Sequence, residues 1–89
     1  MQISTIIYFC NCYLIMLDYE EELKDIICDF KRKEIVEKVI MLKKECGEIL
    51  GINDKERIEQ MNRIMVECLD LDIGVGEMKN ILEYVYENV

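Results

Sequence analysis

Two pairs of acidic residues are the positions at which this sequence could bind a metal ion. Glu45 and Glu48 form the first carboxylate pair, and Glu67 and Asp70 form the second. Residues three apart on a helix share a face, with Cβ atoms about 5–6 Å apart, so each pair presents two carboxylates to one ligand. Four carboxylates suit a hard cation such as Mg²⁺, which keeps water and phosphate oxygens as further ligands. If the two pairs face each other, we expect a magnesium site.

The segments around these pairs read KECGEIL and MVECLDLDIGVGEMKNIL. Their pattern, E-x-x-E followed after a gap by E-x-x-D, resembles the MazG-like all-α nucleoside triphosphate pyrophosphohydrolases, especially the short phage-type members. The resemblance covers roughly residues 34–86. It implies a Mg²⁺-dependent enzyme that converts a nucleoside triphosphate into a monophosphate and pyrophosphate, and it leaves the N-terminal residues unexplained.

The resemblance also implies roles for individual residues. The expected metal ligands are the two carboxylate pairs, Glu45, Glu48, Glu67 and Asp70. Glu48 and Glu67 are the expected catalytic residues, and Lys44 and Lys79 are the expected phosphate contacts. The family motif usually begins with two adjacent acids, and Lys44 replaces the first of them here. A degenerate relative that binds nucleotide without turnover is therefore an alternative.

Composition limits the other possibilities. The chain has 89 residues, enough for one core, and 52% of them are hydrophobic with no proline, which favours a helical domain. The formal net charge of -8 opposes direct nucleic-acid binding. Histidine is absent from the sequence, which excludes Ser-His and Cys-His catalysis. A polyphosphate substrate would need the cation to offset the protein's charge.

A chance origin of the two acidic pairs is the alternative to the enzymatic interpretation. Nineteen acidic residues produce pairs at this spacing by chance, and Glu34 with Glu37 is one example. The rival hypothesis is a non-enzymatic, acidic helical adaptor that binds a protein partner. It predicts acids scattered over the surface and no convergence of the two carboxylate pairs.

The hydrophobic periodicity predicts an antiparallel bundle of three to four helices over residues 18–89, completed by homodimer or homotetramer formation. The first helix begins with an N-cap at Asp18 and runs to about Arg32. The second opens near Lys33, and one side of it carries an apolar stripe, Ile35, Val36, Val39, Ile40, Leu42, Cys46, Ile49 and Leu50. The third follows the capping residues 53–56, and two glycines at 74 and 76 mark either a weak point or a break before the last helical stretch.

The connection between the second and third helices decides whether the carboxylate pairs can meet. A tight turn at Gly51 would offset the two pairs by about 16 Å, at 1.5 Å per residue. A shared cation therefore requires a longer connection, so we expect residues 51–57 to form an irregular or short helical link.

The first 17 residues form an apolar segment whose role the sequence leaves open. It is too short to span a bilayer comfortably and has no preceding basic residues, so we expect a cytoplasmic protein without a membrane partner. It fits a packed strand or helix, a surface for a partner chain, or an upstream extension if synthesis begins at Met16. The five cysteines show no C-x-x-C pair and are expected to be reduced core thiols.

Overall fold

The computed structural model describes residues 3–16, 20–70 and 72–89 of the chain. Within these ranges the chain forms five α-helices and no strand, which confirms the predicted all-α bundle. The α-helices are α1 (Ser4–Cys12), α2 (Leu23–Lys33), α3 (Val36–Leu50), α4 (Lys55–Leu69) and α5 (Val75–Asn88). Two short 3-10 helices, η1 (Leu14–Met16) and η2 (Glu20–Glu22), lie between α1 and α2.

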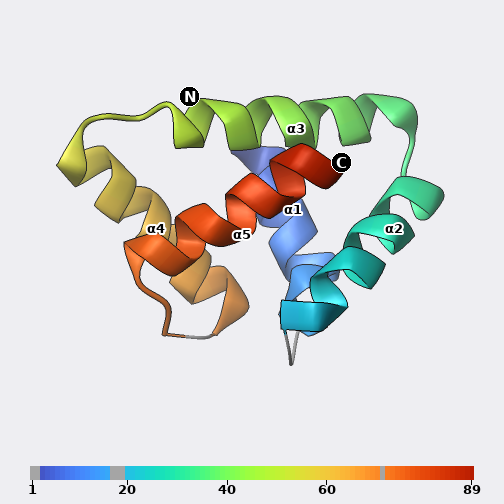
Figure 1. Cartoon of the computed structure of the whole chain (residues 1–89), viewed down its shortest axis with the longest axis horizontal. Coiled ribbons are helices and arrows are strands. Elements are labelled where there is room, and N and C mark those ends of the chain that lie inside the picture. Colours follow the sequence, from blue (N-terminus) through green and yellow to red (C-terminus); the bar gives the residue numbers. More distant parts are fainter. Residues whose placement is uncertain (1–2, 17–19, 71) are drawn as a thin grey trace.

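The helices are arranged around a central pair, α1 and α5. In Figure 1, α3 lies along one side of the molecule, and α2 and α4 lie at its two ends. Both α1 and α5 contact α3 and α4. Side chains from all five helices contribute to a single hydrophobic core. The five helices therefore share one core in the ranges that the structure covers.

The apolar N-terminal segment forms a core helix, α1, in addition to the four α-helices within residues 18–89, a number that agrees with the prediction. Ile6, Phe9 and Cys10 of α1 are buried. The ring of Phe9 packs edge-to-face on the ring of Phe30 from α2, with 5.1 Å between centroids. Aromatic pairs in this geometry contribute about 0.5–1.5 kcal/mol beyond the area they bury. Packing against α1 thus helps to anchor α2.

The first predicted helix agrees with α2 at its C-terminal end, and its expected N-cap, Asp18, lies outside the described residues. The predicted start of the second helix near Lys33 is wrong, because residues 34 and 35 are extended and α3 begins at Val36. The predicted apolar stripe is also partly wrong. Ile35, Val36 and Ile40 are 63%, 69% and 61% exposed, because α3 turns another side towards the core.

The predicted long link after α3 is wrong. Only residues 51–54 separate α3 from α4, because the Asp54 side chain accepts a hydrogen bond from the backbone N–H of Glu56 (3.0 Å) and caps α4.

The region of Gly74 and Gly76 is a true break between the two helices α4 and α5. Asp70 adopts the left-handed conformation (φ 51°) at the end of α4, and Gly74 precedes α5.

None of the helices in the described ranges combines the length and the apolar character needed to cross a membrane.

Candidate functional site

Glu45, an expected metal ligand, caps the N-terminus of α1. Its side chain is 1% exposed, and its Oε1 atom accepts hydrogen bonds from the backbone N–H groups of Thr5 (3.0 Å) and Ile6 (3.2 Å). The residue before α1, Ile3, has no side chain that could cap the helix, and the first turn contains no acid. A carboxylate at this position satisfies backbone donors that would otherwise be unpaired and interacts favourably with the helix dipole.

The other three expected ligands lie on the surface. Glu48, Glu67 and Asp70 are exposed, whereas Glu45 faces the interior. Across residues 3–16, 20–70 and 72–89, the structure contains no group of three or more Cys, Asp or Glu side chains placed to hold a metal ion. The two carboxylate pairs therefore do not form a four-carboxylate site within one chain.

The helix arrangement explains this separation. α3 packs mainly against α5 and α1, and α4 also packs against α1 and α5. The short link sends α4 away from the end of α3 instead of folding it back along α3 (Figure 1). The first carboxylate pair lies on α3, and the second lies at the far end of α4, around Glu67 and Asp70.

The remaining candidates are spread over separate helices. Lys44 is exposed on α3, and Lys79 is half-buried on α5.

A polar cluster that the sequence did not reveal joins α1 to the α2–α3 junction. Glu34 Oε2 accepts hydrogen bonds from the hydroxyls of Tyr13 and Tyr8, the latter at 2.8 Å. The Lys38 ammonium lies 3.6 Å from the centroid of the Tyr8 ring. The hydrogen bonds from Tyr13 and Tyr8 lower the pKa of Glu34, and the same bonds raise the pKa values of both tyrosines.

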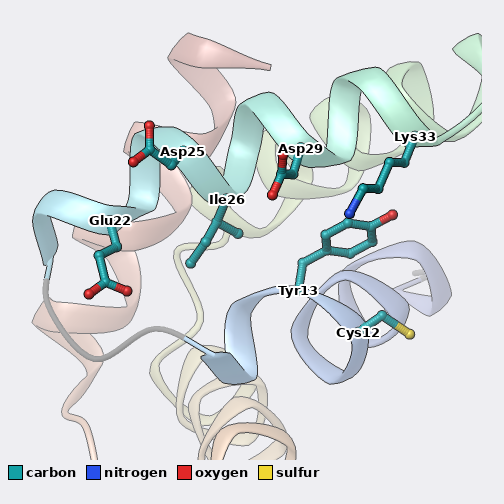
Figure 2. A pocket seen from close by; sticks show the side chains of 7 residues that line it. All are labelled: Cys12, Tyr13, Glu22, Asp25, Ile26, Asp29 and Lys33. Atoms are coloured by element: carbon teal, nitrogen blue, oxygen red, sulfur yellow. The ribbon is translucent and has the colours of Figure 1, made fainter.

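A groove lies beside this cluster, between the end of α1 and α2 (Figure 2). It encloses about 350 Å³ and is lined by Cys12, Tyr13, Glu22, Asp25, Ile26, Asp29 and Lys33. Figure 2 shows the three acids on the side formed by η2 and α2, and Lys33 extending towards the Tyr13 ring. Because acids outnumber the single lysine, the groove disfavours anionic ligands such as a free polyphosphate.

The thiols differ in exposure. Cys10 and Cys46 are buried, and burial raises the pKa of each to about 12, so both remain protonated. Burial also raises the pKa of Cys68. Cys12 and Cys28 are exposed, which corrects the expectation that the thiols lie in the core.

The three most exposed large hydrophobic side chains of the described residues lie at the start of α3. We define the α3 apolar face as Ile35, Val36 and Ile40. Further along the same side, Gly47 lies beneath the Tyr86 ring from α5, and a Cβ atom at this glycine would be 3.0 Å from Tyr86 Cε2. The glycine thus lets the ring of Tyr86, 40% exposed, lie close to α3.

Comparisons of the chain with protein-family models, with curated proteins and with solved structures find no match.

The capping role of Glu45 predicts a specific loss of stability. Glu45→Leu removes the acceptor and leaves two backbone N–H groups of α1 unpaired, at about 1–3 kcal/mol for each buried donor. We expect urea denaturation to show a free energy of unfolding lowered by at least about 2 kcal/mol. Glu48→Leu, three residues along the same helix but exposed, should change it by less than about 0.5 kcal/mol. Equal losses in the two variants would contradict the capping role.

The lowered pKa of Glu34 predicts how its contribution depends on pH. A carboxylate whose pKa is lowered in the folded state stabilises the fold at pH values above its ordinary pKa of 4.5. That stabilisation is lost as the pH falls through the lowered pKa. We therefore expect wild type to be more stable than Glu34→Gln near pH 7, by a margin that shrinks in acid. Urea denaturation across a pH series measures this margin, and a margin constant with pH would refute the assignment.

Proposed function

We propose that this chain is a non-catalytic helical interaction module that binds another helix through the α3 apolar face. The observation that carries the proposal is the exposure, each above 60%, of Val36 and Ile40 on α3 and of Ile35, the residue that precedes this helix. Contiguous exposed apolar surface of this kind marks binding sites on soluble proteins. Single exposed aliphatic residues are common, but three of them within six residues at the start of one helix are more informative.

The chemistry of the face fits a helical partner. Val36 and Ile40 are four residues apart, so their side chains are neighbours on one side of α3. Glu37 and Lys44 are exposed along one edge of that side. An apolar centre with charged edges is the surface that an amphipathic helix recognises with its own apolar face. A partner with matching charges on its edges would bind in a single orientation.

The positions of the acids also support a binding role over a catalytic one. Glu45 Oε1 accepts the hydrogen bonds from the N-terminus of α1, whereas Glu48 is exposed on α3 and Glu67 and Asp70 are exposed at the end of α4. The adaptor hypothesis predicts this lack of convergence.

Site-specific photocrosslinking in cells tests the binding role. A benzophenone amino acid placed at Ile40 should yield a covalent adduct heavier than the free chain, because the probe replaces a side chain in the contact. The same probe at Glu59, exposed on α4, is the matched control and should yield none. Adducts from both positions, or from neither, would argue against α3 as the binding surface.

The Mg²⁺-dependent nucleoside triphosphate pyrophosphohydrolase implied by the MazG-like resemblance is the second candidate function. The spacing of the two carboxylate pairs favours it, and three of those carboxylates, Glu48, Glu67 and Asp70, are accessible to solvent. Carboxylates from another copy or another arrangement of the helices would have to complete a site that binds the cation and activates water.

Pyrophosphate release from each nucleoside triphosphate, with and without Mg²⁺, tests this second candidate. If the chain is an enzyme, release requires the metal and falls at least about 100-fold in Glu48→Gln and Asp70→Asn. Glu59→Gln, an exposed acid outside both pairs, should retain full activity. Absence of metal-dependent release from wild type would eliminate this candidate, and an interaction module would remain.

A further inference from the structure

We propose that the helix bound by α3 is α3 of a second copy of this chain, paired in antiparallel orientation. This inference rests on the proposed function and identifies its partner. The observations that carry it are the spacing of the residues along the outward side of α3, the two different ends of that side, and the charges on its edge.

The outward side of α3 has the spacing of a helix-pairing surface. Val36, Ile40, Lys43 and Gly47 follow one another at intervals of four, three and four residues. Positions at these intervals lie on one side of a helix and pack into the gaps between the same positions of a neighbouring helix. The set extends over about 17 Å at 1.5 Å per residue.

The two ends of this surface are complementary to each other. One end carries the bulky side chains of Val36 and Ile40. The other end carries Gly47, where the half-exposed Tyr86 ring lies against α3, and Lys43, whose ammonium is 5.2 Å from the centroid of that ring. A two-fold axis between positions 41 and 42 places Val36 of each copy against the Tyr86 ring that covers Gly47 of the other. It also places Ile40 opposite the aliphatic stem of the lysine.

The charges on the edge select the antiparallel orientation. Glu37 and Lys44 are seven residues apart, are both exposed and share one edge of the outward side. In the antiparallel pair, Glu37 of each copy lies near Lys44 of the other, so two attractive pairs form. In a parallel pair, the edges that carry Glu37 and Lys44 in the two copies lie on opposite sides of the contact, so these attractive pairs do not form.

The local charge also permits two acidic chains to approach. The formal net charge of -8 makes copies of this protein repel each other at long range. The exposed charged residues of α3 are two acids and two bases, Glu37, Lys43, Lys44 and Glu48. The exposed charges of α3 therefore sum to zero, so this helix adds no net repulsion between copies, and the repulsion from the rest of the chain weakens as salt is added.

The length of the contact between the two α3 helices sets the expected affinity of the dimer. A stable complex generally buries about 800 Å² on each partner, and a single pair of helices touching over about 17 Å buries less. We therefore expect a reversible dimer whose population rises with protein concentration.

Sedimentation velocity over a concentration series tests the dimer. A reducing agent is present throughout, because the exposed Cys12 and Cys28 could otherwise link chains by disulfide bonds. Wild type should shift from one to two chains per particle as its concentration rises. Ile40→Glu should remain a monomer at every concentration, and Glu59→Lys on α4 should behave as wild type.

Reversing the charges of Glu37 and Lys44 tests the antiparallel orientation of the two helices. Both residues are exposed, so we expect each variant to fold as wild type does. Glu37→Lys leaves only lysines at the two edge positions, and Lys44→Glu leaves only glutamates, so each variant alone should dimerise about tenfold more weakly than wild type. An equimolar mixture of the two variants restores both attractive pairs. It should form a mixed dimer with an affinity close to that of wild type.

The outcomes separate this inference from the proposed function. Weaker dimerisation of each charge variant alone and recovery of the wild-type affinity in the mixture would support antiparallel α3 pairing. A dimer abolished by Ile40→Glu but unaffected by the charge exchanges would overturn the antiparallel orientation. A monomer at all concentrations would overturn the inference alone if the probe at Ile40 still captured another protein. The proposed function would fail as well if that probe captured nothing.

Discussion

The hydrogen bonds between Glu45 and the first turn of α1 are the constraint on which the rest of this structure depends. α1 is an apolar helix with no cap of its own, so the N–H groups of Thr5 and Ile6 in its first turn need an acceptor from elsewhere in the chain. Glu45 supplies it and thereby sets the rotation of α3 about its axis. Because each residue of an α-helix turns by about 100°, the position nine residues earlier, Val36, points to the opposite side.

The same rotation gives α3 two different sides. Its inward side carries Leu42, Cys46 and Ile49 into the core, together with the capping carboxylate. Its outward side carries the α3 apolar face and the two edge charges. Burial of one acid and exposure of several aliphatic residues are thus two consequences of one geometric requirement. This is why the residue that most resembled a metal ligand and the surface that we propose for binding lie on the same helix.

A second carboxylate holds α1 near its other end. Glu34 accepts hydrogen bonds from Tyr8 and Tyr13 and lies where the chain leaves α2 and enters α3. Phe9 packs against Phe30 between these two polar contacts. The apolar N-terminal segment, whose role the sequence left open, is therefore fixed to α3 through Glu45 and to the α2–α3 junction through Glu34. It is an integral part of the core in the described ranges.

The sequence by itself determined the all-α class and most of α2 and α4, because regular apolar spacing and the capping residue Asp54 act within a few neighbours along the chain. It did not determine which side of α3 is buried, since apolar residues occur on both sides of that helix, at Val36 and Ile40 and at Cys46 and Ile49. Nor could it locate the partner of Glu45, which lies about 40 residues away. Only the tertiary structure decided these points, because the first turn of α1 and the middle of α3 become neighbours only when the helices pack.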